Sequence, residues 1–274
     1  MARLEGFRLL LIEEVILEKT NKTPTIQSVT RAISILRCFE QQRELGLTEI
    51  TKLLGLHKST TAGLINTLRA EGFLEQNPRT GKLRLGLGLF SLAVGARMEL
   101  SEICEPHLTH LLEMTGETVN FAVRDGYQIM YISKRESEHS MRISTRVGAK
   151  MPLYCTGIGK AILSMTPRAE VLELLDEIDL IPYTANTITD RRVLLDELDK
   201  IKSSGIAYDN EELELGLVCI AAPLYHGSDC VGAISVSGPS VRMDAPVLAK
   251  IAEMLRTSVL KICAEFSKLS VNSI

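Results

Sequence analysis

The chain has 274 residues, of which 45% are hydrophobic and 24% are charged, and its formal net charge is -3. This length leaves room for two modest domains, each with enough apolar residues for a buried core. No apolar run approaches the roughly 20 residues that a membrane helix needs, so no membrane-spanning helix is expected. The six cysteines form no C-x-x-C pair and no signal peptide is found. We therefore expect a cytoplasmic protein with no zinc site, no other metal and no cofactor.

The charge is distributed unevenly along the chain. Residues 25–86 contain nine Lys or Arg and five Asp or Glu, so this segment carries +4 while the remainder sums to -7. A local positive excess favours binding to a polyanion. The residues before it, 1–24, end in the polar run Thr20 to Pro24 and are expected to form a flexible tail.

Residues 25–86 have the pattern of a winged helix-turn-helix. A first helix over 26–40 has an apolar stripe at Val29, Ile33, Leu36 and Phe39. A second helix over 48–54 stops at Gly55. A third helix begins near Lys58 and ends before Gly72. Two short strands, 73–77 and 82–85, then form a hairpin, the wing, whose turn contains Pro78 and Gly81.

The third helix has an outer face suited to a DNA groove. Leu64, Ile65 and Leu68 point to the core, and the opposite face has short polar side chains and a positive start, as a groove-binding helix requires. The alternative is a small helical unit used only for packing, but such units seldom add a basic wing. The residues expected to contact DNA are Lys58, Ser59, Thr60, Thr61 and Asn66 on the helix, and Arg79 and Lys82 on the wing.

Residues 87–100 are expected to form a linker helix with an apolar side. Since paired DNA-reading modules match a palindromic site by two-fold symmetry, we expect this helix to dimerise. Packing on its own chain is the alternative.

Residues 101–274 are expected to form an α+β domain with one twisted antiparallel sheet flanked by helices. Helices are predicted over 102–115, 167–177 and 246–266, with another after 157–160 and one that Thr189 caps and that reaches Ser204. Strands are predicted over 118–123, 127–133, 141–147, 206–208, 217–222 and 231–237.

Polar residues at strand ends in this second domain could form a cleft for a short anion. The run from Cys155 to Lys160 leads into a helix start, where free amides favour a carboxylate. Asp209 follows one predicted strand, Cys219 lies in the next, and Ser235 and Ser237 alternate onto one face of the last. The alternative is that the serines face water, Asp209 starts a turn and Cys219 is a small core residue. The run to Lys160 lacks two positions of a phosphate loop, no G-x-S-x-G elbow occurs, and the histidines have no metal spacing.

Five segments resemble the IclR family of bacterial transcriptional regulators. They are LTEITKLLGLHKSTTAGLINTLRAEGFLEQNPRTGKLRLG, GETVNFAVRDG, RVGAKMPLYCTGIGKAIL, GIAYDNEELELGLVCIAAP and GAISVSGP. The resemblance implies a winged helix-turn-helix, a linker helix and a GAF-like effector-binding domain, acting as a homodimer or homotetramer on double-stranded promoter DNA, often as a repressor. It implies a small carboxylate effector, with a weaker similarity to members that sense sugar-acid catabolites. By position, the effector-binding residues would be Gly157, Ile158, Gly159, Asp209, Cys219, Ser235 and Ser237.

One departure from the family and two rival functions remain open. Where the family commonly has long polar residues aimed at base edges, this chain has Ala62 and Gly63, so base reading is expected to shift to neighbouring polar residues. The first rival is a regulator that senses thiol oxidation through Cys155 and Cys219. The second is an enzyme with one of these cysteines as nucleophile, although no histidine lies near them in the motifs.

Overall fold

The computed structural model describes residues 25–40, 42–93, 98–143, 145–227 and 229–268, so the expected tail, 1–24, lies outside the described residues. The chain divides into two compact units, Met1–Met98 and Glu99–Ile274. None of the described helices combines the length and hydropathy of a membrane span.

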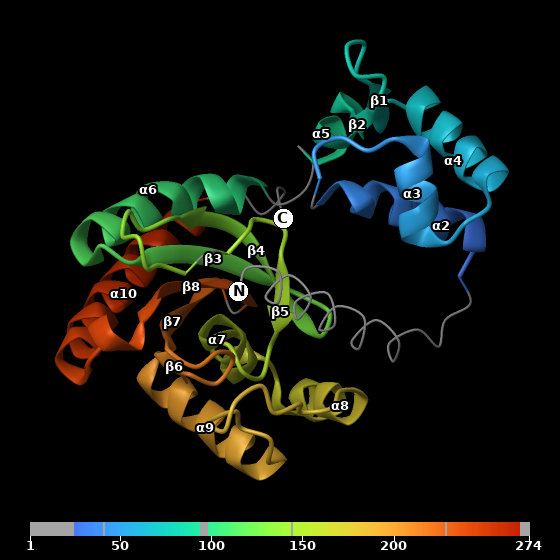
Figure 1. The fold of residues 1–274 in the computed structure, drawn as a ribbon. Coiled ribbons are helices and arrows are strands. Elements are labelled where there is room, and N and C mark those ends of the chain that lie inside the picture. Colours follow the sequence, from blue (N-terminus) through green and yellow to red (C-terminus); the bar gives the residue numbers. More distant parts are fainter. Residues whose placement is uncertain (1–24, 41, 94–97, 144, 228, 269–274) are drawn as a thin grey trace. The chain divides into compact units, whose positions relative to one another are not determined.

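The first unit is the predicted winged helix-turn-helix (Figure 1). Helix α2 (Gln27–Arg37) leads through the short η1 (Cys38–Glu40) to α3 (Leu47–Leu54) and α4 (Lys58–Ala70). The wing consists of β1 (Leu74–Gln76) and β2 (Leu83–Leu85), which pair antiparallel, and the bridge between Leu45 and Leu83 adds a third short segment. Gly55 ends α3 in the left-handed conformation, at φ 60°, as its place between the helices predicts.

One small core holds this unit together. Its buried side chains are Ile35, Phe39, Leu45, Ile50, Ile65, Leu68, Leu74 and Leu83. The apolar stripe predicted on the first helix is partly wrong, because Val29 and Ile33 are 52% and 47% exposed and Ile35 is buried instead. Helix α2 contacts α3 and α4 through the side that carries Ile35, which leaves a second apolar side outside.

Two glycines join the wing to the helix that follows. A Cβ at Gly86 would lie 2.2 Å from the Gly72 carbonyl oxygen, and a Cβ at Gly88 would lie 2.8 Å from the same atom. The Gly88 amide donates a hydrogen bond to that oxygen at 3.0 Å. Helix α5 (Leu87–Ala93) therefore begins in direct backbone contact with the end of the helix-turn-helix. Residues 94–97 of the predicted linker lie outside the described residues.

The second unit is built on a six-stranded antiparallel sheet in the order β5-β4-β3-β8-β7-β6. The strands are β3 (Thr118–Asp125), β4 (Gln128–Arg135), β5 (Lys150–Pro152), β6 (Ala207–Asn210), β7 (Leu217–His226) and β8 (Asp229–Pro239). The helices are α6 (Met98–Thr115), α7 (Gly157–Met165), α8 (Arg168–Glu177), α9 (Arg191–Ser204) and α10 (Ala245–Phe266), with the short η2 (Ser240–Arg242) before the last. This is the α+β architecture that the alternation of elements predicts.

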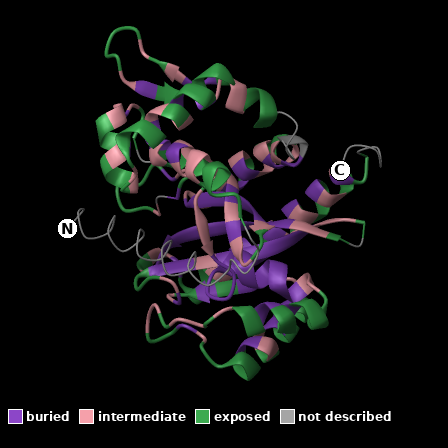
Figure 2. Ribbon diagram, turned by 90° about the vertical axis from the view of Figure 1, so that its right-hand side faces the viewer, coloured by how far each residue is buried: buried purple, intermediate pink, exposed green. Residues whose placement is uncertain are grey.

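The helices cover the two faces of the sheet separately (Figures 1 and 2). Helices α6 and α10 pack on one face around Phe121, Ile220 and Ile234. Helices α7, α8 and α9 pack on the other face, where the central strands present Ala122, Ala221 and other small residues. Figure 2 shows the sheet and α7 as the buried centre of this unit.

Two local predictions in this unit are wrong. The segment 141–147 is not a strand in any of its described residues. It is instead held by side chains of β3, since Thr118 donates to the Ile143 carbonyl and the Thr145 hydroxyl donates to Asn120. Helix α9 is capped by Asp190, whose carboxylate accepts from the amides of Arg192 and Val193, and not by the preceding threonine.

Candidate DNA-binding and effector sites

Helix α4 presents an exposed polar face in the first unit. Lys58, Ser59, Thr60 and Asn66 are exposed, and the side chain of the N-cap residue His57 does not cap the amides at the start of the helix. A Cβ at Gly63 would meet no atom within 4 Å, so packing does not require a glycine there. The face therefore has the short polar groups and free amides that contact a groove and its phosphates.

Thr61 does not belong to this face, contrary to the prediction. Its side chain is fully buried, and its hydroxyl donates to the His57 carbonyl at 3.1 Å. Thr61, Ile65 and Leu68 are the three buried residues of α4 and follow each other at helical spacing. The short polar side chain fits the core because the preceding turn satisfies its hydroxyl.

The wing cations differ in their partners. Lys82 pairs with Glu49 of α3 at 3.1 Å, and Arg84 pairs with Glu75 of β1 at 2.5 Å. Arg79 lies in the exposed turn, and its backbone amide donates to the Asn77 side chain at 2.8 Å. All three side chains are on the surface, and exposed pairs of this kind are weak enough to exchange for phosphate contacts.

The structure places four of the predicted polar residues of the second unit side by side on the sheet, and we call these four residues the polar rows. Asp209 of β6 pairs with Cys219 of β7, which pairs with Ser237 of β8. Ser235 lies two residues before Ser237, and the two hydroxyls are 3.4 Å apart. Directly paired and alternate residues share a face of a sheet, so these four side chains lie on the α7 side.

The alternative that these serines face water is excluded, because Ser235 and Ser237 are only 2% and 3% exposed. Asp209 is 1% exposed, and its carboxylate accepts from the Glu212 amide at 2.8 Å, so it also stabilises the turn after β6. Cys219 is partly exposed.

The start of α7 lies against these strands. A Cβ at Gly157 would be 3.5 Å from the Cβ atoms of Cys219 and Ala221. Thr156 caps the helix by accepting from the Gly159 amide at 3.1 Å. The amides of Gly157 and Ile158 belong to the first turn, where a helix provides no backbone acceptor. They are the groups that could bind a carboxylate beside the polar rows.

Gly159 and Ile158 have packing roles that their place in the motif does not reveal. A Cβ at Gly159 would be 2.1 Å from the Leu153 carbonyl oxygen, so a glycine is required for α7 to approach this segment. The Ile158 side chain is buried in the core between the sheet and α7.

Sequence reasoning missed several polar residues of this region. Asn120 pairs with Ser235 across β3 and β8, and its amide nitrogen lies 3.5 Å from the Ser235 hydroxyl. Lys160 and Glu212, which are 1% and 5% exposed, form a buried ion pair. A lysine on an otherwise apolar helix and an acidic run after a strand were the available signals, but neither identifies its partner.

Burial changes the pKa values of the carboxyl groups in this region. Loss of hydration raises the pKa of Asp209 to about 7, and it also raises the pKa of Glu212 despite the Lys160 partner. The second carboxylate oxygen of Glu212 is buried and has no hydrogen-bond partner among the residues that the structure describes. Asp209 is therefore partly protonated near neutral pH, when it can donate as well as accept a hydrogen bond.

The cysteines have the properties of inert thiols. Burial raises the pKa of Cys155 and of Cys219, and nearby carboxyl groups raise both further. Because the thiolate is the reactive form, a raised pKa lowers the reactivity of both toward oxidants and carbonyl groups.

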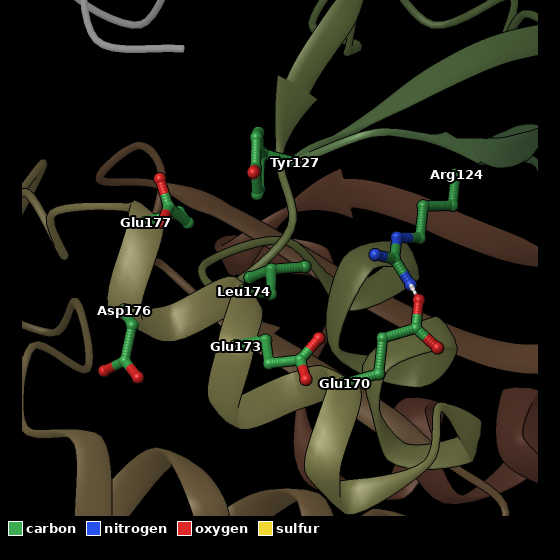
Figure 3. Close-up of a pocket in the computed structure, with 7 residues that line it drawn as sticks. All are labelled: Arg124, Tyr127, Glu170, Glu173, Leu174, Asp176 and Glu177. Carbon is green, nitrogen blue, oxygen red and sulfur yellow. Dashed lines mark hydrogen bonds and ion pairs between the residues drawn. The ribbon is translucent and has the colours of Figure 1, made fainter. Parts of the chain in front are cut away.

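A separate groove of about 560 Å³ opens on the surface of this unit (Figure 3). It is lined by Arg124, Tyr127, Glu170, Glu173, Leu174, Asp176 and Glu177. Arg124 donates to Glu170 at 2.6 Å, which leaves the groove with an excess of negative charge. It does not suit an anionic ligand. Among the described residues, no group of His, Cys, Asp or Glu is placed to hold a metal ion.

Comparison with known proteins finds a family match for each of the two units. Residues 28–78 match the model of the IclR helix-turn-helix domain, and residues 92–264 match that of the bacterial transcriptional regulator IclR C-terminal domain. The HTH-type transcriptional regulators XynR and KdgR of Escherichia coli strain K12 are 36% and 33% identical to this chain. The matches cover 87% of this chain and 96% of XynR, and 88% of this chain and 93% of KdgR.

The crystal structure of the Thermotoga maritima IclR protein is also similar, with 30% identity and a TM-score of 0.73 over 89% of this chain and all of the other. The exposed polar helix with its wing, the buried polar rows and these matches lead to one conclusion. The chain belongs to the IclR family of bacterial transcriptional regulators and is a ligand-responsive DNA-binding regulator, not an enzyme.

Proposed function

We propose that this regulator represses a catabolic operon and releases or reshapes its operator complex when a small hydroxy or sugar acid binds beside α7. The observation that carries the effector class is the set of short polar groups on one face of the sheet next to the first-turn amides of Gly157 and Ile158. These groups provide hydrogen-bond donors for a carboxylate and both donors and acceptors for hydroxyl groups.

The DNA contacts that we propose come from α4 and the wing. Lys58, Ser59 and Thr60 would bind a phosphate at the helix start, Asn66 would reach a base edge, and Arg79 would contact the backbone or the minor groove. Lys82 can join them by exchanging its partner Glu49 for a phosphate.

We further propose that the regulator acts as a dimer or a tetramer of the same chain. Helix α5 leaves Leu87, Phe90 and Leu92 at least 65% exposed, and Ile26, just before α2, and Val29 on α2 are more than half exposed. Large apolar side chains at this density favour burial against a second copy. Phe90→Ser should lower the molar mass measured by light scattering at equal concentration.

The effector can shift DNA affinity only by as much as its own affinity differs between the two states of the regulator. The test is a gel shift of the full-length protein at fixed salt, on the DNA upstream of its own gene, across two- to six-carbon oxo, hydroxy and sugar acids. One acid should remove or strengthen the specific band. A specific band that no acid changes would refute the effector class.

Two matched variants test whether the effector binds beside the polar rows. Ser235→Ala removes a buried hydroxyl from the polar rows, whereas Ser164→Ala removes a buried hydroxyl of α7 that donates to the Ala161 carbonyl. We expect Ser235→Ala to raise the acid concentration needed for the response while DNA affinity without acid stays unchanged. Ser164→Ala should leave both unchanged. Equal effects of the two variants would indicate a structural role.

The thiol-sensing alternative, in which peroxide and not an acid changes DNA binding, is tested separately. It requires reactive thiolates at Cys155 and Cys219, whose pKa values burial raises. If the signal is an acid, the double variant with serine at both positions should still respond to it, with a changed sensitivity because Cys219 lies in the polar rows, and peroxide should not change DNA binding by the original protein.

A further inference from the structure

The turn of the wing is fastened to the segment before α3 by one carboxylate. Glu44 accepts a hydrogen bond from the Asn77 side-chain amide and a second, of 2.8 Å, from the Thr80 hydroxyl. These two hydrogen bonds lower the pKa of Glu44, so it is a carboxylate at neutral pH. The neighbouring residue Leu45 forms the backbone bridge to Leu83, which brings Glu44 alongside the turn.

The Asn77 side chain connects Glu44 to the backbone of Arg79 through two hydrogen bonds. Its amide nitrogen donates to Glu44, and its oxygen accepts from the Arg79 backbone amide at 2.8 Å. A carboxylate can only accept hydrogen bonds, so Glu44 dictates which end of the Asn77 amide faces it. The other end must then face Arg79, and the backbone of Arg79 is fixed as a result.

Arg79 is the wing cation with the most freedom to contact DNA. Lys82 and Arg84 are each held by a glutamate, whereas Arg79 makes no ion pair within the part of the chain that the structure describes. The guanidinium is exposed at the tip of the turn. Its contribution to binding therefore depends on where the turn holds its backbone.

The negative charge of Glu44 is expected to act on DNA affinity in the opposite direction from its hydrogen bonds. A negative charge next to a DNA-binding surface repels phosphates and lowers affinity. If charge alone mattered, removing Glu44 would strengthen DNA binding. If its contacts to the turn matter more, removing it would weaken binding.

We propose that Glu44 is a positioning residue for DNA binding, which acts through the Asn77 amide to set where Arg79 meets the phosphate backbone. This inference rests on the wing contact in the proposed function. It assigns the role to a residue that carries the same sign of charge as the DNA.

Two substitutions at Glu44 separate the contacts from the charge. Glu44→Ala removes both hydrogen bonds, whereas Glu44→Gln keeps an acceptor for Asn77 and can donate to Thr80 while it removes the charge. The probe is the duplex that the full-length protein selects from a random library, and affinity is measured by fluorescence anisotropy at several salt concentrations. We expect Glu44→Ala to weaken binding about three- to tenfold, and Glu44→Gln to bind as tightly as the original protein or more tightly.

A third variant controls for charge elsewhere on the wing. Glu75→Gln removes a carboxylate of β1 that pairs with Arg84 of β2. It should strengthen binding slightly or leave it unchanged. If Glu44→Ala also strengthens binding, Glu44 acts only through its charge and the proposal is wrong. Thermal unfolding of each variant should match that of the original protein, since Glu44 and Glu75 are not buried.

A double-mutant cycle with Arg79→Ala tests the route of the effect. Arg79→Ala alone should weaken binding and reduce the salt slope by about one unit, as the loss of a phosphate contact requires. With alanine already at position 79, Glu44→Ala should change affinity by less than about twofold. If Glu44→Ala weakens binding as much in that background as in the original protein, Glu44 does not act through Arg79. That result would refute the positioning role of Glu44 and leave the proposed function standing. An unchanged salt slope in Arg79→Ala would overturn the wing contact itself, and with it both proposals.

Discussion

The two faces of the six-stranded sheet use different residues on the same strands. Toward α6 and α10, the central strands present large side chains such as Phe121, Ile220 and Ile234. Toward α7, their immediate neighbours are Asn120, Ala221 and Ser235, which are smaller or polar. Strand geometry forces this alternation into two faces. Both faces bury an apolar core, and the α7 face also has hydrogen-bonding groups that could meet a ligand.

The largest expected effect is on the apolar face. Phe121 is fully buried there, and Phe121→Ala should lower the free energy of unfolding by about 3 to 5 kcal/mol through lost burial and a cavity. Urea unfolding of the full chain measures this loss. Leu172→Ala, at a leucine of α8 that is 45% exposed, is the control and should cost much less. Similar losses in the two variants would mean that Phe121 stabilises the fold no more than a half-exposed side chain does.

The next effect concerns the buried ion pair on the α7 face. Lys160→Met leaves Glu212 buried without its cation and should cost about 3 kcal/mol, with part of the loss relieved as Glu212 takes up a proton. Replacing both residues, by Lys160→Met with Glu212→Leu, should recover most of the stability. If the double variant is as unstable as the single one, the pair contributes more than charge compensation.

Asp209 should make stability depend on pH. Its pKa rises from 3.8 to about 7 on folding, so between these values the folded chain binds more protons than the unfolded one. Stability therefore falls as pH rises through this window, by up to about 4 kcal/mol at about 1.4 kcal/mol per pKa unit. Asp209→Asn removes this contribution, although the raised pKa of Glu212 acts in the same direction and remains.

Urea unfolding at pH 5 and pH 8 tests this expectation. The stability of Asp209→Asn relative to the original protein should increase between the two pH values. A difference that does not change with pH would mean that Asp209 stays ionised in the folded chain.

The smallest effect on stability is expected for a hydroxyl of the polar rows. Ser237→Ala removes a hydroxyl whose neighbour Ser235 lies at a long 3.4 Å, so the cost in unfolding free energy should be about 1 kcal/mol or less. The same substitution should weaken the response to the acid that the gel shift identifies. A large loss of stability would show that this hydroxyl supports the fold.

Periodicity and turn residues predicted most of the fold. The helix stop at Gly55 and the wing turn were predicted correctly, because local backbone geometry determines them. The predicted strand over 141–147 failed because alternation cannot distinguish pairing with an edge strand from contacts with side chains on a sheet face. Thr61 was misplaced because a threonine with an internal hydrogen bond is compatible with a core.

The candidate effector site was predictable only as a set of separate residues. Family motifs indicated Asp209, Cys219 and the two serines, and strand pairing brings them together. The sequence did not reveal that Lys160 binds Glu212, because 52 residues separate them and no local pattern joins them. Asn120 was missed because a single asparagine in an apolar strand resembles a tolerated exception.

The backbone contacts of Gly86 and Gly88 with Gly72 have a mechanical consequence. No side chain separates the first turn of α5 from the end of the helix-turn-helix, so there is no soft layer between them that could absorb a displacement. Helix α5, the wing and α4 should then rotate together as one rigid body. A signal that rotates α5 would be delivered to the groove-facing helix at nearly its full angle, and bulky residues in place of these glycines would uncouple the two.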